Sequence, residues 1–469
     1  MTERRIEITG YSPLHLAWQA IGWWPVQTRS TTDRVFLALV AVLPLHTVFL
    51  SVWISWKPFL VLLVAIGVAD VAAAIRVRAW PYHRTLSIAL LAFGLLLLTG
   101  YPAAPFRERF FQLGLAIAVG AMVMLVTERR LRTADLIDDL LTVVFWTGGA
   151  MGVTAVLLSL VNFGVFGAEA VNAINEVPGI FRTSKPAYLE SGFIALTNWH
   201  QDPGYGAAWS VLWAALALVA AARRPRAGLG IEGAVIGGLA FAVLMAFSRT
   251  GWLALPLGLT IVGVSLVRAG WVDVAWITKR LGVAAAVAVT LTAFMFVVDP
   301  PEVAGDVDLQ FAFRLSQGWD LLADITGLFE RSDVAFGDRF EPSEERADVW
   351  PEYWEMFTSN PILGVGLGVG WLTNSILQEP HNLVLELLAE TGLLGLGAFL
   401  AVMIVIIRSG RGAVAGALLA VTFLPAMTQT VLFEPTWWFA AGIYLSGALS
   451  DVVTAGRPDR LSFQTPRGT

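Results

Sequence analysis

A histidine followed by two carboxylates stands at the start of one apolar stretch of the chain. His381 and Asn382 precede the stretch, and Glu386 and Glu390 lie inside it, four residues apart, on one helical face. A neutral imidazole, which titrates near about pH 6.5, can take a proton from a hydroxyl group at neutral pH. Acidic residues within an apolar helix usually face a cavity or a partner. A single interfacial histidine is more often a structural residue, and general-base chemistry at His381 is the functional alternative.

Two arginines lie beside other apolar stretches and could bind an anion. Ser248-Arg249 lies in a short connection between two such stretches, and Arg346 lies four residues before Trp350 in an acidic, aromatic-rich segment. A guanidinium group binds phosphate oxygens bidentately and stays charged. Insertion of an arginine at membrane depth costs roughly 2.5–3.5 kcal/mol of free energy. Such a residue is therefore expected to have a structural or functional role. Snorkelling of Arg249 and pairing of Arg346 with neighbouring carboxylates are the structural alternatives.

A run of glycines follows the segment that carries Arg346. Asn360-Pro361 precedes Gly364, Gly366 and Gly368. The run is superficially similar to a nucleotide-binding loop, but no strand–loop–helix context surrounds it. The glycines therefore either let the backbone pack closely or present N–H groups to an anion.

Metal and thiol chemistry have little support. The chain has no cysteine, which excludes disulfides, thiolate metal sites and cysteine nucleophiles. His200, Asp202 and His381 could supply metal ligands, but their spacing is not typical of any metal site. The sequence therefore predicts no metal.

The elements that hold these residues must be membrane helices. Of the 469 residues, 56% are hydrophobic and only 14% are charged, with a mean hydropathy of +0.68, whereas a soluble protein is roughly 25% charged. Apolar stretches long enough to span a bilayer, apart from one short stretch, predict an all-α integral membrane protein of about 12 transmembrane helices. The stretches cover residues 35–54, 59–75, 86–98, 111–127, 140–163, 204–222, 229–247, 252–267, 281–298, 387–407, 413–432 and 437–453.

The distribution of basic residues predicts the orientation. With the N-terminus in the cytoplasm, most of the 31 Lys and Arg residues fall on the cytoplasmic side, as the positive-inside rule requires. Residues 1–34 lack the short apolar core of a cleavable signal peptide, so the first helix is expected to insert the chain. The predicted organisation is a cytoplasmic segment (1–34), nine spans (35–298) with an outer loop (164–203), a large extracytoplasmic loop (299–382), three spans (383–453) and a cytoplasmic tail (454–469).

The large loop before the tenth span is acidic, with four arginines and no lysine, and is expected to be mostly helical. Trp350, Tyr353, Trp354 and Phe357 recur at helical spacing in it, and residues 311–329 carry a similar stripe. Aromatic helix faces beside a membrane prefer the interface. Such a face either docks the loop onto the membrane helices or lines a groove for a lipid-borne substrate.

In this order and on this side of the membrane, these stretches resemble the O-antigen ligase and polymerase superfamily. Its members carry a Ser-Arg pair at a membrane hairpin, Arg-x-x-x-Trp, Asn/Asp-Pro with Gly-x-Gly-x-Gly, and His-Asn with Glu-x-Gly-x-x-Gly. The corresponding residues here are Ser248-Arg249, Arg346 to Trp350, Asn360-Pro361, Gly364 to Gly368, His381-Asn382 and Glu390 to Gly395. The resemblance covers about 204–400. Many members have Asp-Pro-Asn where this chain has Asp202-Pro203-Gly204-Tyr205.

The resemblance implies an enzyme that transfers a glycan from a lipid-diphosphate-linked donor, such as an undecaprenyl-diphosphate glycan. Arg249 and Arg346, with Ser248, would bind the diphosphate and stabilise the charge that develops as it leaves. The acceptor would be a glycolipid, a glycan or a protein. Membrane lipids would surround the enzyme, and no nucleic acid would take part.

The resemblance also implies the catalytic roles. His381 would take the proton of the acceptor hydroxyl, and Glu386 or Glu390 would orient its imidazole. A single displacement would invert the anomeric centre. No metal or cofactor would be needed, because arginines supply the positive charge. Further pocket candidates are Asp202, Tyr205, Trp350 and Asn382.

The expected location is the bacterial inner membrane, with both termini in the cytoplasm and the active site on the periplasmic side. A ligase, a repeat-unit polymerase and a protein O-oligosaccharyltransferase would use the same donor, and the sequence leaves all three open, with ligase preferred. A transporter of twelve spans and a structural scaffold are the alternatives outside this enzyme class. A transporter would be expected to show related halves and polar residues near the midplane of the bilayer.

Overall fold

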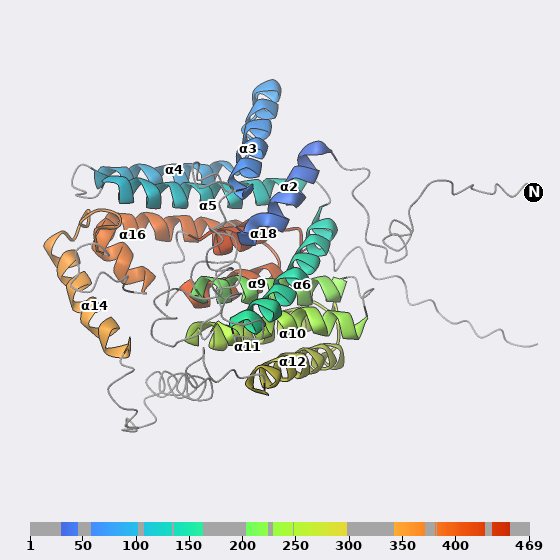
Figure 1. The fold of residues 1–469 in the computed structure, drawn as a ribbon. Helices are drawn as coiled ribbons and strands as arrows, with labels where there is room; N and C mark the ends of the chain where they lie inside the picture. Colours follow the sequence, from blue (N-terminus) through green and yellow to red (C-terminus); the bar gives the residue numbers. More distant parts are fainter. Residues whose placement is uncertain are drawn as a thin grey trace, which may run out of the picture.

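The computed structural model describes residues 30–45, 58–101, 107–133, 136–162, 203–223, 228–246, 248–297, 342–370, 380, 382–426 and 434–450. Every regular element within these residues is a helix (Figure 1). The helices are α2 (Thr31–Val42), η2 (Leu43–Leu45), α3 (Pro58–Val77), α4 (Arg84–Thr99), α5 (Arg107–Thr133), α6 (Ile137–Asn162), α9 (Pro203–Arg223), α10 (Leu229–Met245), α11 (Arg249–Arg268), α12 (Val274–Val297), α14 (Pro342–Ser359), α16 (Leu383–Ser409), α17 (Ala413–Ala426) and α18 (Pro435–Ser446).

The all-helical membrane architecture predicted from the sequence is confirmed. Each of the twelve apolar stretches overlaps one of these helices, and the remaining parts of some stretches, such as residues 46–54 and 427–432, lie outside the described residues. Seven helices, α3, α5, α6, α9, α11, α12 and α16, are long and apolar enough to cross a membrane, and α4, α10 and α17 contain shorter apolar segments. The count of twelve spans therefore stays a prediction. The outer loop 164–202 and residues 299–341 of the large loop, including the aromatic stripe at 311–329, lie outside the described residues.

Helix α9 is the centre of the bundle. Its side chains from Ala207 to Ala221 are all buried, because α6, α10, α11 and α17 pack around it. The indole of Trp213 stacks on Phe439 of α18, with ring centroids 5.7 Å apart. Helix α18 packs on α5, and α16 packs on α4 (Figure 1). Helix α9 is therefore enclosed by protein, although its composition alone would allow it to face lipid.

A close approach of two backbones joins α6 to α10. A Cβ atom at Gly152 would lie 3.1 Å from the Cα atom of Gly238, and a Cβ at Gly238 would lie 3.2 Å from the Cα of Gly152. Small residues at helix contacts let membrane helices pack by van der Waals attraction, since lipid offers no hydrophobic driving force between them.

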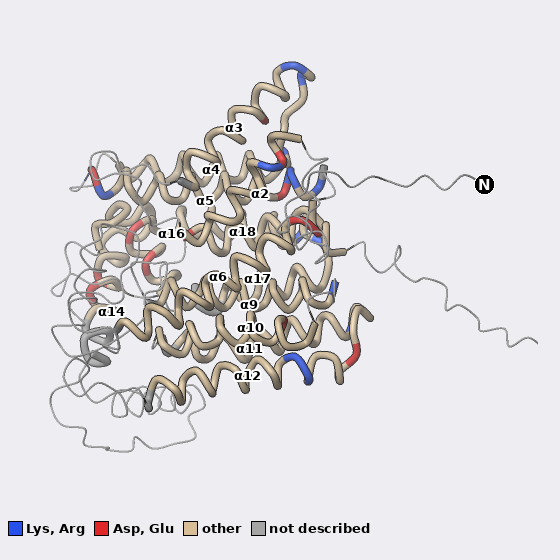
Figure 2. Tube along the Cα trace, turned by 45° about the vertical axis from the view of Figure 1, so that its right-hand side comes forward, with Lys and Arg blue, Asp and Glu red and all other residues tan. Residues whose placement is uncertain are grey.

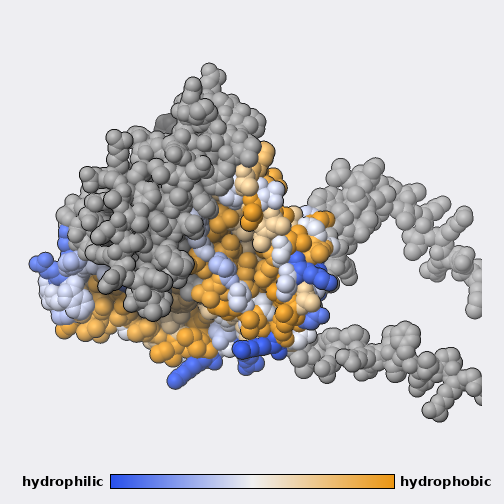
Figure 3. Space-filling view, turned by 90° about the horizontal axis from the view of Figure 1, so that it is seen from below, coloured by the Kyte–Doolittle hydropathy of each residue, from blue (hydrophilic) through white to orange (hydrophobic). Residues whose placement is uncertain are grey.

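Broad areas of the described surface are apolar (Figure 3). Side chains that are about half exposed or more include valines, isoleucines and leucines on α3, α4, α5 and α16, such as Val68, Ile75, Leu91 and Ile404. Soluble proteins rarely expose apolar areas of this extent to water. Contact with lipid is the physical explanation, in agreement with the composition.

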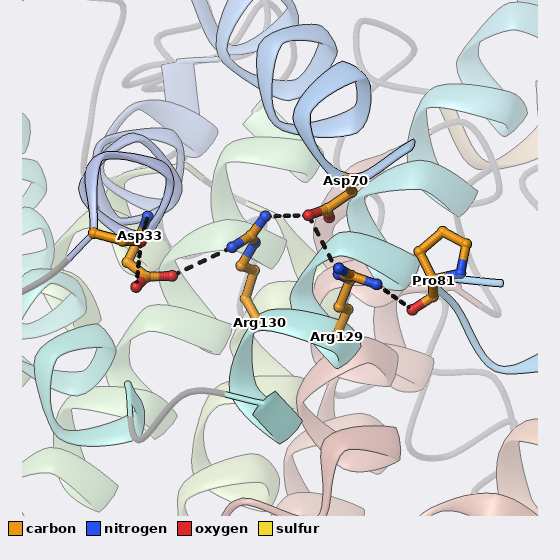
Figure 4. A network of polar contacts seen from close by, with 6 residues as sticks. Asp33, Asp70, Pro81, Arg129 and Arg130 are labelled. Atoms are coloured by element: carbon orange, nitrogen blue, oxygen red, sulfur yellow. Dashed lines mark hydrogen bonds and ion pairs between the residues drawn. The ribbon is translucent and has the colours of Figure 1, made fainter. Parts of the chain in front are cut away.

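Most described Lys and Arg residues lie at one end of the bundle, on the right in Figure 2, and α14 lies at the opposite end. At the basic end, the carboxylate of Asp70 is 1% exposed and lies between Arg129, at 3.2 Å, and Arg130. Arg130 also contacts Asp33, at 3.3 Å, and Arg129 donates to the carbonyl of Pro81, at 2.7 Å (Figure 4). The network ties α2, α3 and α5 together with the connection that leads into α4.

Tyr82 borders this network on the α3–α4 connection. Its ring lies 6.0 Å from the guanidinium carbon of Arg129. Burial, reinforced by the charge of Asp70, raises the pKa of the Tyr82 phenol to about 12. The phenol is therefore neutral at physiological pH.

Two further ion pairs link helices at the basic end. Arg280 of α12 pairs with Glu232 of α10, at 2.6 Å, and its guanidinium lies 3.7 Å from the ring centroid of Trp276. Arg223 of α9 pairs with Asp138 of α6. The sequence indicated only which side of the membrane these arginines occupy, whereas the structure shows that they also join neighbouring helices.

Candidate functional site

Helix α16 begins with a side-chain cap. Asn382 is its N-cap, and the Oδ1 atom accepts hydrogen bonds from the backbone N–H groups of Val384 and Leu385, each at 3.1 Å. An N-cap satisfies backbone donors that the first helical turn leaves without partners. The cap thus fixes the backbone next to His381. His381 itself lies outside the described residues.

The same helix is interrupted one-third of the way along. Gly392 has φ 64° and ψ −168°, which is not a helical conformation. The N–H groups of Leu393 and Leu394 donate to the carbonyls of Pro361 and Ile362, at 2.9 and 3.2 Å. The chain after α14 therefore supplies acceptors at the interruption.

The hydrogen bonding at the interruption is reciprocal. The N–H groups of Val365 and Gly366 donate to the carbonyls of Ala389 and Glu390 of α16, both at 2.9 Å. A Cβ atom at Gly364 would overlap the peptide that joins Glu390 to the next residue. We call this structure, in which residues 360–370 fit into the break of α16 at 389–394, the glycine interlock.

Left-handed backbone in the interlock explains its glycines. Gly364, Gly366 and Gly368 have φ values of 69°, 103° and 75°. Residues with a Cβ atom rarely adopt such angles, whereas glycine adopts them freely. The spacing of these three glycines is therefore a requirement of the backbone.

The carboxylate of Glu390 completes the interlock from the α16 side. Its Oε2 atom accepts the N–H of Gly368 at 2.9 Å, and its Oε1 atom accepts the N–H of Gly370 at 3.3 Å. The side chain of Glu390 is buried, with 3% of its surface exposed. These N–H groups are directed at protein acceptors. Gly364 and Gly366 thus pack closely on the backbone of α16, and the N–H groups of Gly368 and Gly370 are presented to an anionic group of the protein itself, the carboxylate of Glu390.

Helix α14 packs on α16 through one side of its aromatic face. Tyr353 is 1% exposed and packs with Ala389, and its ring fills the space that a Cβ at Gly370 would need. Trp350 and Trp354 are 49% and 54% exposed. Both interpretations of the stripe thus remain relevant: one part of it docks α14, and another part remains an accessible aromatic surface.

A hydrogen bond joins α14 to the chain beside the histidine. The Nε1–H of Trp350 donates to the carbonyl of Pro380 at 2.9 Å. Arg346 lies one turn earlier on α14, and its side chain lies outside the described residues. The hydrogen bond therefore brings the helix that carries Arg346 to the residue that precedes the His381-Asn382 pair in the sequence, at the start of α16.

The residues at the start of α11 form a second group of candidate site residues. Ser248 is its N-cap and accepts the N–H of Gly251 at 3.2 Å, and Arg249 is the first helical residue. A Cβ at Gly251 would lie 2.8 Å from the Cβ of Ala207 on α9. Tyr205, half-buried, lies on the first turn of α9. The start of α11 therefore lies against the start of α9. Asp202 and the side chain of Arg249 lie outside the described residues.

Comparison with known proteins identifies the segment that contains both groups. Residues 233–400 match the family model described as O-antigen ligase. The segment is similar to the O-antigen ligase family. The match confirms the family resemblance of the sequence and covers a little over a third of the chain. No curated protein and no solved structure matches the chain.

The matched segment contains the interlock, α14 and the start of α11. Helix α11 packs on α9 and α17, whereas α16 packs on α4 and α14. Helix α18, which contacts α9, α16 and α17, lies between them. The structure thus collects the Arg346, Glu386, Glu390 and Asn382 positions around α16, and places Ser248 and Arg249 on a neighbouring part of the bundle.

Glu386 occupies the first turn of α16 and is 6% exposed. A helix rises by about 1.5 Å per residue, so Glu386 lies about 6 Å along the axis from Asn382 and Glu390 about 12 Å. Of the two glutamates, Glu386 is therefore the closer to the start of α16. Within the described residues, no group of three His, Cys, Asp or Glu side chains could hold a metal ion.

The interlock also receives residues from outside the matched segment. A Cβ at Gly100, after α4, would lie 3.6 Å from the Cα of Gly366, and the side chain of Arg109 on α5 lies against Gly368. Neither residue belongs to a recognised motif. The only sequence signal was the position of the α4–α5 connection on the same predicted side of the membrane.

Proposed function

We propose that the protein moves a glycan from a lipid-diphosphate-linked donor to an acceptor hydroxyl, as an O-antigen ligase-like glycosyltransferase. The family and the membrane helices imply a membrane enzyme of glycan assembly. The observation that carries the proposal is the hydrogen bond from Trp350 to Pro380, because it holds the helix of Arg346 against the residue that precedes His381 in the sequence. A cation for the diphosphate and a base for the acceptor then belong to one site.

The site is assigned to the extracytoplasmic side. Most described basic residues lie at the end of the bundle opposite α14, and the positive-inside rule places such an end in the cytoplasm. A donor that is embedded in the outer leaflet would present its diphosphate at the level of α14. The bacterial inner membrane with a periplasmic active site fits this arrangement.

The proposed reaction is a single displacement. The acceptor oxygen forms a bond to the anomeric carbon while the bond from that carbon to the diphosphate oxygen breaks. His381 takes the proton of the acceptor hydroxyl, and the electron pair of the broken bond leaves with the diphosphate. Arg249 and Arg346 stabilise the leaving charge, with Ser248 beside them. Attack opposite the leaving group inverts the anomeric centre.

The positive charge needed by the leaving group comes from arginines in this proposal, so the reaction uses neither a metal nor another cofactor. Glu386 is the carboxylate placed to orient the imidazole, because it lies in the first turn of α16 and is buried. Trp350, Asn382 and, from α9, Tyr205 and Asp202 are the proposed pocket residues.

Reconstitution tests the proposal. Purified protein in lipid nanodiscs is incubated with an undecaprenyl-diphosphate glycan and candidate acceptors, and free undecaprenyl diphosphate and product size are measured. His381→Ala is expected to lower the rate by about 100- to 10,000-fold, and Arg249→Ala or Arg346→Ala by about 100- to 1,000-fold. Arg268→Ala is the matched control, since Arg268 is exposed at the other end of α11.

The product separates the members of the class. A single added glycan indicates a ligase, and a ladder that grows on the donor lipid indicates a polymerase. Transfer to a peptide indicates a protein O-oligosaccharyltransferase. Unchanged donor with every acceptor would contradict the proposal, and movement of the substrate across sealed vesicles would then identify a transporter.

A further inference from the structure

The buried carboxylate of Glu390 has a role that the proposed reaction leaves unexplained. Burying a charged carboxylate is expensive unless hydrogen bonds compensate it. Both oxygen atoms of Glu390 accept backbone N–H groups of the glycine run, from Gly368 and Gly370. Hydrogen bonds from N–H groups to a carboxylate are roughly twice as strong as those between neutral partners. The side chain is therefore engaged with the backbone of another segment.

The distance along α16 argues against direct contact between Glu390 and the histidine. Glu390 is nine positions after His381 in the sequence, and its axial rise from Asn382 is about 12 Å. Its carboxylate is also directed at Gly368 and Gly370. Glu386 lies one turn closer.

A continuous series of contacts leads from Glu390 back to the site. The carboxylate accepts the N–H of Gly370, and the ring of Tyr353 packs on Gly370. Trp350 lies three residues before Tyr353 on the same helix and donates to the carbonyl of Pro380. Each contact joins two segments: the glycine run to α16, α14 to the glycine run, and α14 to the chain before α16.

We propose that Glu390 is a positioning residue, whose carboxylate holds the glycine run in the break of α16 and thereby fixes α14 against the start of that helix. In the transferase, whose function this inference assumes, the effect is to set Arg346 relative to His381. Glu390 acts on catalysis through the backbone and makes no contact with the reacting groups.

Glutamine is the informative replacement. A glutamine side chain has nearly the same shape, but it has one acceptor oxygen and one N–H₂ donor. In Glu390→Gln one of the two glycine N–H groups would face another donor. The side chain at position 390 then makes one hydrogen bond to residues 368–370 instead of two, while the backbone hydrogen bonds at residues 361–366 remain. The end of the glycine run that contacts Tyr353 is therefore less firmly held, and α14 is less firmly positioned.

A distance measurement tests the positioning without depending on activity. The chain has no cysteine, so Glu355→Cys on α14 and Leu400→Cys on α16, both at exposed positions, give one pair of spin labels. Pulsed electron–electron double resonance on the full chain in nanodiscs is expected to give a narrow distribution of the distance between the two labels. With Glu390→Gln added, the distribution should broaden or shift. An unchanged distribution overturns the proposal.

Kinetics then separates positioning from direct contact. Glu390→Gln is expected to lower kcat by about 100-fold, the effect of a displacement of about 1 Å at a reacting centre, while the pH dependence of kcat stays that of the wild type. A shift of the pH profile would indicate that Glu390 acts on the imidazole itself and would overturn the proposal.

A stability control excludes general damage. Gly237→Ala disturbs the contact of α10 with α12, because its Cβ would lie 2.7 Å from the carbonyl oxygen of Ala284. If this variant loses as much stability and as much activity as Glu390→Gln, the positioning role is refuted. If wild-type protein transfers no glycan but Glu390→Gln alters the spin-label distance, the proposed function fails and the positional role of Glu390 stands.

Discussion

Replacing Gly364 by alanine tests the glycine interlock most directly. Gly364 has φ 69°, and an alanine in left-handed conformation costs roughly 1–2 kcal/mol. The new Cβ would also overlap the backbone of α16 at Glu390, so the two segments must separate. Separation weakens the hydrogen bonds from Val365 and Gly366 to α16, each of which contributes about 0.5–1.5 kcal/mol. The expected loss of stability is therefore about 2–5 kcal/mol.

The assay is unfolding of the purified protein in detergent, followed by tryptophan fluorescence against temperature and against added denaturing detergent. Gly397→Ala is the matched control. Gly397 lies on the same helix, and its Cβ would meet no atom within 4 Å. Alanine there should stabilise the helix by roughly 0.5–1 kcal/mol. A Gly364→Ala protein as stable as the wild type would refute the interlock.

Three further predictions concern stability. Asp70→Asn should lower stability by about 3–5 kcal/mol, since it leaves two arginines without their buried counter-ion, and an unchanged melting temperature would contradict this. Tyr353→Ala should cost about 3–5 kcal/mol and Trp354→Ala much less, because only the tyrosine is buried; equal losses on thermal unfolding would contradict it. For Tyr82, whose pKa is raised to about 12, stability should be complete below about pH 10 and fall as the pH rises toward 12. Tyr82→Phe should remove that alkaline loss in unfolding measured from pH 9 to 12.

The membrane helices could be predicted from the sequence because hydropathy is a local property. Each apolar stretch carries its own signal, and each overlaps a described helix of the structure. Packing could not be predicted in the same way. Helix α9 has the same apolar character as its neighbours, yet it is enclosed by them. Whether a helix faces lipid or protein depends on partners that are distant in the chain.

The candidate site shows the same limit at the level of single residues. The sequence identified Gly364, Gly392 and Glu390 as parts of motifs, but it did not show that they meet. Their contact depends on the non-helical angles of Gly392, which no composition or period reveals. The helix-capping roles of Asn382 and Ser248 follow a known local preference and could have been predicted.

The contact between the α4–α5 connection and the interlock bears on how chains of this family can diverge or be recombined. The segment 233–400 carries the recognisable motifs, but Arg109 and Gly100 complete its surface from an earlier part of the chain. A chimera that exchanges only the recognised segment would bring together two contacting surfaces that come from different proteins. We expect positions 100 and 109 to covary with positions 366 and 368 among relatives. Functional chimeras should therefore arise mainly when the α4–α5 connection is transplanted with the segment.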